Sequence, residues 1–211
     1  MTLPKLPDNS ASIIISPPLS GKKEFLYSYL FDSLKNKEPV IFLSTDSSSE
    51  DIKKDLLKSK IFYGTYKDIL RFVDCYSQQA GNNVQDSEDI RRVPGPIALN
   101  EISVVLAQIE AELYKISEKH IVIFDSLSTL LMYSNPQMIG RFLQILIAKI
   151  KNAGGSVLFT IEEGMHDQKD LITIEHFMDA LVYVKKDKEN VLFKVQSSKC
   201  SLDWCELNTA I

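Results

Sequence analysis

Cysteine is scarce in this chain of 211 residues. Its three cysteines, Cys75, Cys200 and Cys205, are an odd number, and no pair has the close spacing of a zinc ribbon. A secreted disulfide scaffold and a zinc-ribbon protein are therefore excluded. Reduced thiols are typical of the cytosol, so we expect a cytoplasmic protein.

Long apolar runs and an excess of basic residues are also missing. No stretch approaches the length needed to cross a bilayer, and no basic segment followed by an apolar one opens the chain. The 24 basic and 28 acidic residues give a net charge of -4, which phosphate backbones and anionic lipids repel. We expect a soluble protein that binds neither nucleic acid nor membrane.

Hydrophobic residues, in contrast, make up 45% of the chain, which is enough for a substantial core. No repeat has the period of a solenoid or a propeller. The one loop-like change in composition is the polar run at about residues 78–96, which we interpret as an insertion. We predict one domain over residues 1–211, ending in a C-terminal tail at about 197–211.

Short apolar runs alternate with segments of helical periodicity. The predicted strands are 12–15, 40–44, 70–75, 120–124, 157–161, 181–184 and 191–195. The predicted helices are 24–34, one that follows the N-cap Ser48, 99–114, one from Pro136 to the Gly154-Gly155 stop, and 172–178. Continuous apolar strands between helices predict an α/β fold, with a mostly parallel sheet and helices on both faces. The last two strands flank a polar turn and predict a C-terminal antiparallel hairpin.

In a sheet of this kind, ligands bind beyond the carboxyl ends of the strands. The residues expected at that rim are the loop 16–23, Asp46, Asp125 and Thr160. We therefore expect these groups to converge on one site.

The loop between the first strand and the first helix is placed where a phosphate-binding loop belongs. It reads Ser16, Pro17, Pro18, Leu19, Ser20, Gly21, Lys22 and Lys23. Such a loop needs inward backbone N–H groups, a lysine that reaches phosphates and a hydroxyl that binds Mg²⁺. Gly21 and Lys22 meet two of these needs. Ser16 and Leu19, however, stand where glycines are usual, and Lys23 replaces the hydroxyl. The alternative is a plain strand-to-helix turn with an exposed lysine pair.

A second element supports the phosphate-loop interpretation. Residues 121–124 are an apolar run that ends in Asp125, at the separation from Lys22 expected of a Walker B strand. That carboxylate would hold the water shell of Mg²⁺. The alternative is an ordinary aspartate that caps the next turn.

Together these segments resemble the RecA superfamily, and specifically the archaeal KaiC-like ATPases. The resemblance runs from about Ser12 to Val195 and rests on a spaced set of short segments. They are 20–22 in the loop, 44–46 after the second strand, 74–77, 122–128, 142–144, 164–167 and 178–182.

The resemblance implies a P-loop site for ATP or ADP with several roles. Lys22 would contact the phosphates, Asp125 would serve Mg²⁺, and Thr160 would act as a sensor near the γ-phosphate. Relatives place a glutamate after the second strand to activate water, whereas this chain has Asp46, which is one methylene shorter. Many relatives form rings, so the resemblance also implies a homo-oligomer.

We therefore predict a nucleotide-binding regulatory protein with little or no ATP hydrolysis, acting through protein contacts. Loss of the catalytic base and of the metal-binding hydroxyl would leave hydrolysis slow, since a general base typically contributes about 10²- to 10⁴-fold. A further hypothesis, the two-lysine hypothesis, is that ATP binding is largely independent of Mg²⁺ if Lys22 and Lys23 both point into the loop. The first alternative is a competent ATPase that uses Asp46 or a neighbouring subunit's carboxylate. The second is a scaffold that binds no nucleotide, or a DNA-repair recombinase paralogue. The acidic segment 162–170 argues against the recombinase, because it repels phosphate backbones.

Overall fold

The computed structural model describes residues 3, 6–82, 85–198 and 201–207. Its strands are β1 (Ala11–Ser16), β2 (Val40–Ser44), β3 (Leu70–Asp74), β4 (Ile90–Arg92), β5 (Ile121–Asp125), β6 (Ser156–Glu162), β7 (Ala180–Asp187), β8 (Asn190–Ser197) and β9 (Ser201–Glu206). They form one sheet in the order β4-β3-β2-β5-β6-β1-β7-β8-β9. All pairs from β4 to β7 are parallel, and the β7–β8 and β8–β9 pairs are antiparallel.

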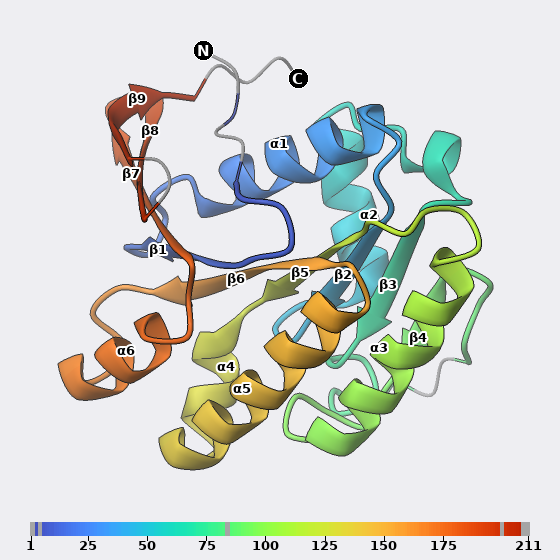
Figure 1. Ribbon diagram of the computed structural model, residues 1–211. Helices are drawn as coiled ribbons and strands as arrows, with labels where there is room; N and C mark the ends of the chain where they lie inside the picture. Colours follow the sequence, from blue (N-terminus) through green and yellow to red (C-terminus); the bar gives the residue numbers. More distant parts are fainter. Residues whose placement is uncertain (1–2, 4–5, 83–84, 199–200, 208–211) are drawn as a thin grey trace.

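Helices cover both faces of this sheet (Figure 1). They are α1 (Lys22–Lys35), α2 (Ser49–Lys58), the 3-10 turn η1 (Tyr63–Tyr66), α3 (Leu99–Leu113), α4 (Leu127–Tyr133), α5 (Pro136–Asn152) and α6 (Gln168–Glu175). Helices α1 and α2 pack on one face and α3 to α6 on the other. The predicted fold class is therefore confirmed. Within the described ranges, none of the helices combines the length and apolar character needed to traverse a bilayer.

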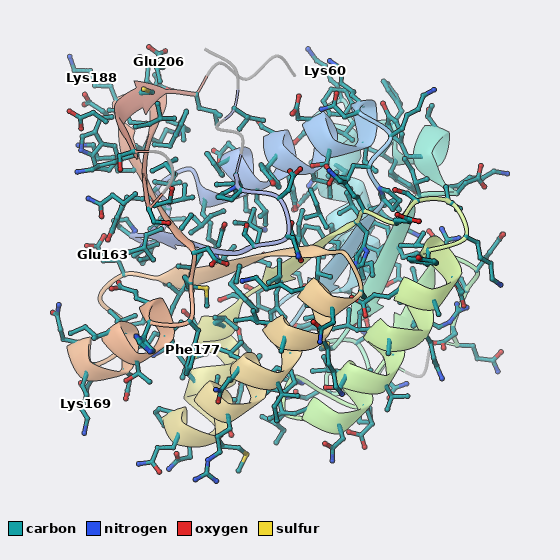
Figure 2. All side chains as sticks on the ribbon, viewed as in Figure 1. Lys60, Glu163, Lys169, Phe177, Lys188 and Glu206 are labelled. Carbon is teal, nitrogen blue, oxygen red and sulfur yellow. The ribbon has the colours of Figure 1, made fainter. Side chains whose placement is uncertain are left out.

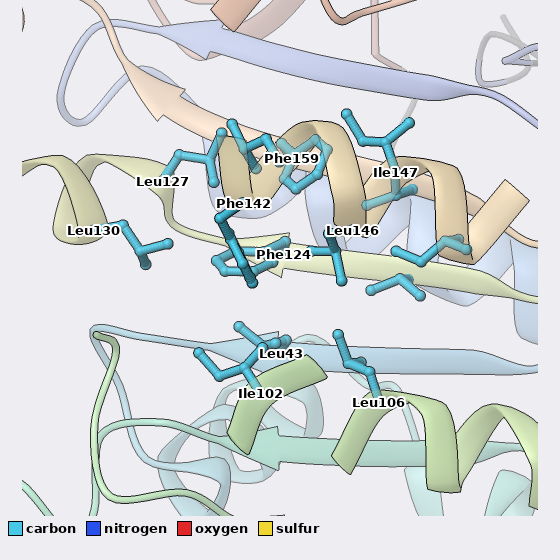
Figure 3. Packing of buried hydrophobic residues seen from close by; sticks show 14 of the residues in the cluster. Leu43, Ile102, Leu106, Phe124, Leu127, Leu130, Phe142, Leu146, Ile147 and Phe159 are labelled. Carbon is cyan, nitrogen blue, oxygen red and sulfur yellow. The ribbon is translucent and has the colours of Figure 1, made fainter. Parts of the chain in front are cut away.

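The central strands are buried on both faces, which explains their continuous apolar sequences. All five residues of β2 and of β5 are buried. On the face covered by α3 and α5, the rings of Phe124 and Phe159 lie 5.6 Å apart at their centroids, in a cluster with Phe142 and Ile102 (Figure 3). On the opposite face, Phe25 of α1 packs on Phe193 of β8 at 5.5 Å. The sheet is therefore fixed by one apolar cluster on each side.

Side-chain caps set where several helices begin. The Ser48 Oγ accepts the N–H of Asp51 at the start of α2, as its sequence predicts. At α5, Asn135 caps the first turn, and Pro136 occupies the first helical position. These local signals explain why α2 and α5 begin where the sequence indicates.

Four elements were not predicted from the sequence, and a fifth was misplaced. One of the four is the 3-10 turn η1, which follows α2. Helix α4 follows Asp125 directly, β4 lies inside the polar run 78–96, and β9 lies inside the expected tail 197–211. Helix α6 begins at Gln168, earlier than the predicted residue 172. Of these two regions, residues 83–84, 199–200 and 208–211 lie outside the described residues. The insertion and the tail thus each contribute an outermost strand to the sheet.

Strand β9 carries the single tryptophan of the chain. Trp204 is 40% exposed, and the Lys185 ammonium lies 4.0 Å from the centre of its ring. Because Lys185 belongs to β7, this contact passes over β8 and joins the two outer strands of the antiparallel end.

Candidate functional site

The segment from Ser16 to Lys23 joins β1 to α1 through a short turn. Leu19 has a φ of 58° and Gly21 a φ of 88°, so both have a left-handed backbone conformation. For a residue other than glycine this conformation costs about 1–2 kcal/mol. The Leu19 side chain is 100% exposed, so no burial of this side chain offsets the cost. The loop thus has a leucine at a left-handed position where a glycine would relieve the backbone strain.

Gly21 is required by its surroundings as well as by its backbone angle. A Cβ atom placed there would lie 2.6 Å and 2.8 Å from the two Cγ atoms of Val191 on β8. Real Cβ atoms do not approach other carbons so closely, so any larger residue would displace the loop or the strand. Strand β8 therefore packs directly against the loop at Gly21.

The first turn of α1 has backbone N–H groups that are available to a ligand at the loop. In the part of the chain that the structure describes, the N–H groups of residues 22–24 have no acceptor, as is usual in the first turn of a helix. Ser20 is buried, and its Oγ likewise has no partner among the described residues. Pro17 and Pro18 carry no N–H group, so the loop has fewer donors than an intact phosphate loop. The remaining donors suit an anion such as a phosphate.

The Lys22 ammonium lies at the predicted site, next to two carboxylates. Its Nζ lies 3.4 Å from Asp125 Oδ1 and 3.4 Å from Glu162 Oε1, and its side chain is 11% exposed. Burial alone would lower the pKa of Lys22, but the charges of Asp125, Asp46 and Glu162 outweigh it and raise the pKa. Lys22 is therefore a fixed cation at the carboxyl ends of β5 and β6. The sequence did not single out Glu162 as its partner.

Asp125 and Thr160 meet beside this lysine. The Thr160 Oγ1 donates to Asp125 Oδ1 over 2.6 Å, and both side chains are buried. The contact follows from the parallel pairing of β5 with β6, which aligns Phe124 with Phe159. Thr160 thus fixes the orientation of the Asp125 carboxylate with the hydroxyl to which the resemblance assigns the sensor role.

Asp46 follows β2 at the same rim. Its side chain reaches solvent, yet the protein around the carboxyl group removes enough water to raise its pKa. The negative charge of Asp125 raises it further, whereas Lys22, Lys23 and a hydrogen bond with Ser47 act in the opposite direction. The resulting pKa is about 6. Asp46 is therefore mostly ionised at pH 7 and retains the capacity to accept a proton.

Lys23 does not join Lys22 at the loop. Its Nζ lies 3.6 Å from Asp55 Oδ2 on α2, and its side chain is 55% exposed. The two-lysine hypothesis requires both ammonium groups to point into the loop, and this condition is not met, because Lys23 pairs with Asp55 on α2. Lys22 is therefore the one of the two lysines whose ammonium lies at the loop.

The site suits Mg²⁺ poorly. Among the described residues, no group of three or more histidine, cysteine or acidic side chains is arranged to hold a metal ion. Asp125 Oδ1 is shared between Lys22 and Thr160. Since Lys23 also points away and has no hydroxyl, the ligand set that Mg²⁺ uses in an intact phosphate loop is not assembled.

Solved structures with the same fold include two from Pyrococcus horikoshii. A KaiC-like protein from the hyperthermophilic archaeon Pyrococcus horikoshii aligns with 95% of this chain and 86% of its own, at a TM-score of 0.67 and 11% identity. An uncharacterized protein from Pyrococcus horikoshii, determined in complex with an unknown peptide, aligns with 92% of this chain and 85% of its own, at a TM-score of 0.72 and 15% identity. At these identities the similarity establishes the KaiC-like fold alone.

The sequence itself gives a more specific assignment. No curated protein matches the chain. Residues 11–184, however, match DUF7504, described as a family of unknown function. Because this match spans most of the chain, the protein belongs to the DUF7504 family and has a KaiC-like fold.

Proposed function

We propose that this protein binds ATP or ADP weakly at the loop 16–23, hydrolyses it slowly or not at all, and acts through protein contacts. The observation that carries the proposal is the position of Lys22. Its ammonium lies at the carboxyl ends of β5 and β6, at the start of α1 with its unpartnered N–H groups. The buried and unpartnered Ser20 Oγ adds a further donor in the same loop.

Weak affinity is expected because phosphates must compete with carboxylates for Lys22. Asp125, Glu162 and Asp46 all act on its ammonium, so the site carries more negative than positive charge. An incoming phosphate is repelled by the acids while it is attracted by the lysine. The two prolines of the loop also remove donors that would otherwise compensate.

Slow hydrolysis follows from the same geometry. The metal-binding hydroxyl is replaced by Lys23, whose ammonium pairs with Asp55 instead. Asp46 is shorter than the glutamate that the resemblance implies for activating water. When general-base catalysis and metal stabilisation are both impaired, turnover falls by several orders of magnitude.

Protein contacts are the proposed output. Three large apolar side chains at the junction of α4 and α5, Met132, Tyr133 and Met138, are more than half exposed. The peptide bound to the Pyrococcus horikoshii structural neighbour shows that a protein of this fold can hold a polypeptide. We propose that the chain acts as one domain over residues 1–211, in the cytoplasm, as a homo-oligomer or with a protein partner.

Calorimetry with ATP and ADP, each in Mg²⁺ and in EDTA, tests the proposal together with an assay of phosphate release. We expect saturable weak binding that Lys22→Met abolishes and that Lys35→Met, at the other end of the same helix, leaves intact. Absence of binding would favour the scaffold alternative. A turnover in the ordinary enzyme range of about 1–10³ per second would contradict the proposal.

One observation favours a competent ATPase as the second candidate. The pKa of Asp46 is raised to about 6, and a general base works best when its pKa lies near the working pH. If Asp46 activates water, Asp46→Asn should abolish phosphate release without weakening nucleotide binding. Equal release by both proteins would exclude this role.

A further inference from the structure

Glu162 is the last residue of β6, and the segment that leads to α6 begins directly after it. Its Oε1 lies 3.4 Å from the Lys22 Nζ, where it occupies one side of the ammonium. Strand β6 pairs with β1, the strand that enters the phosphate loop, and this pairing aligns Ser16 with Glu162. An acidic side chain is thus built into the place from which Lys22 would reach a phosphate.

We propose that Glu162 is an internal competitor for the phosphate, a carboxylate that neutralises Lys22 in the ligand-free protein and leaves it when a phosphate binds. The inference rests on the proposed function, because it specifies how that site is regulated. It makes Glu162 a positioning residue, which sets the affinity of Lys22 for anions and transmits occupancy to the segment 162–167.

The two carboxylates beside Lys22 differ in their freedom to move. Asp125 is buried and receives the Thr160 hydroxyl, so it is held on two sides. The Glu162 side chain is 29% exposed, and Lys22 is its one partner among the described residues. Releasing Glu162 therefore exchanges one ion pair for hydration, whereas releasing Asp125 would leave a charge buried. Glu162 is the group that yields to a ligand.

The backbone around Glu162 is tied to both sides of the site. Its N–H donates to the Ser128 Oγ in the first turn of α4 over 2.9 Å. The N–H of Glu163 donates to the carbonyl of Ser16, where the phosphate loop begins, also over 2.9 Å. The backbone that carries the Glu162 side chain is thereby tied to the loop on one side and to α4 on the other.

The segment beyond Glu162 faces solvent. Met165 is 42% exposed and Ile172, on α6, is 57% exposed. Figure 2 shows Glu163 at the periphery of the molecule, in the segment that joins β6 to α6. A change at Lys22 would thus reach a surface that another protein can contact.

Glu163 provides a matched control for Glu162. It carries the same charge one residue away and is exposed, and no side-chain hydrogen bond or ion pair to it is found in the described part of the chain. Replacing either glutamate by glutamine removes one negative charge from this end of the sheet. Both substitutions change the overall electrostatic field in a similar way. A difference in phosphate affinity between Glu162→Gln and Glu163→Gln therefore reports the contact with Lys22.

The experiment is calorimetric titration of the full-length chain with ATP and with inorganic pyrophosphate, in EDTA at pH 7.5. We expect Glu162→Gln to bind both at least about tenfold more tightly than the parent, a gain of about 1.4 kcal/mol. Glu163→Gln should remain within about twofold of the parent. Glu162→Asp, which withdraws the carboxylate by one methylene, should fall between the parent and the glutamine variant. A purely structural role for Glu162 predicts weaker binding, not tighter.

Hydrogen exchange supplies the second measurement. In the parent, saturating pyrophosphate should accelerate exchange at the Glu163 amide and its neighbours up to residue 167, whereas Glu162→Gln should exchange fast with or without pyrophosphate. Equal affinities of the parent and both glutamine variants would overturn the inference and leave the proposed function standing. Binding by the Glu162 variant alone would support the inference. Binding by neither protein would refute the proposed function, and the inference with it.

Discussion

Replacing Gly21 by alanine should destabilise the protein by about 2–5 kcal/mol. The left-handed backbone angle of 88° accounts for about 1–2 kcal/mol. The new Cβ would lie 2.6 Å and 2.8 Å from the Val191 methyl carbons, and overpacking of this kind costs about 1–3 kcal/mol. These two contributions differ in origin, so they can be separated by a second substitution at Val191.

Val191→Ala removes the two methyl groups that the new Cβ would meet. By itself it should cost about 1–3 kcal/mol, because Val191 is buried and its loss leaves a small cavity. Combined with Gly21→Ala it should relieve about 1 kcal/mol or more of the clash, giving a favourable coupling between the two sites. The relief is partial, since the Val191 Cβ would still lie 3.2 Å away.

Urea denaturation followed by far-ultraviolet circular dichroism gives all four free energies of unfolding in this cycle. We expect the double variant to lose less free energy of unfolding than the two single variants lose in sum. Additive losses would show that the loop relaxes away from β8 without cost. A Gly21→Ala variant within about 0.5 kcal/mol of the parent would refute the argument entirely.

Three further outcomes are expected. Asp46→Asn should raise the urea midpoint at pH 7, with the gain shrinking as the pH falls toward 4, because a pKa of about 6 against the ordinary 3.8 makes ionised Asp46 favour the unfolded state. Glu110→Ala should cost about 1–3 kcal/mol in the same assay, because it leaves the buried His120 Nε2, now 2.9 Å from Glu110 Oε1, without its partner. Lys23→Ala should change stability by less than about 1 kcal/mol and leave ATP affinity in EDTA within a few-fold, since its ion pair with Asp55 is exposed; a tenfold loss of affinity would restore the two-lysine hypothesis.

The strands and long helices were predictable because burial dictates their sequence patterns. Strand β5, for example, is apolar up to Asp125 because both of its faces are covered. Helix α4 was missed because seven residues are too few for a clear period, and because the serine that caps it, Ser126, is equally typical of a turn. Strand β9 was missed because edge residues are mostly exposed and so carry no apolar pattern.

The candidate site was predictable in its position but not in its pairings. The alternation of strands and helices placed Lys22 and Asp125 at one rim, since the carboxyl ends of parallel strands share an edge. The contact between Lys22 and Glu162 depends on the position of β1 between β6 and β7 in the sheet. No local sequence pattern encodes this strand order. The pairing of Lys23 with Asp55 likewise depends on how α2 lies beside α1.

The location of Trp204 determines what intrinsic fluorescence can report. Its indole lies on the outermost strand, 40% exposed and beneath the Lys185 ammonium, far along the sheet order from β5 and β2. A tryptophan fluorescence change during denaturation therefore reports the loss of structure around β9, whereas circular dichroism reports the secondary structure of the whole chain. If the fluorescence transition comes before the circular dichroism transition, the difference between their free energies is the free energy of opening β9. A ligand that binds beside this strand would shift the tryptophan emission spectrum without any engineered label.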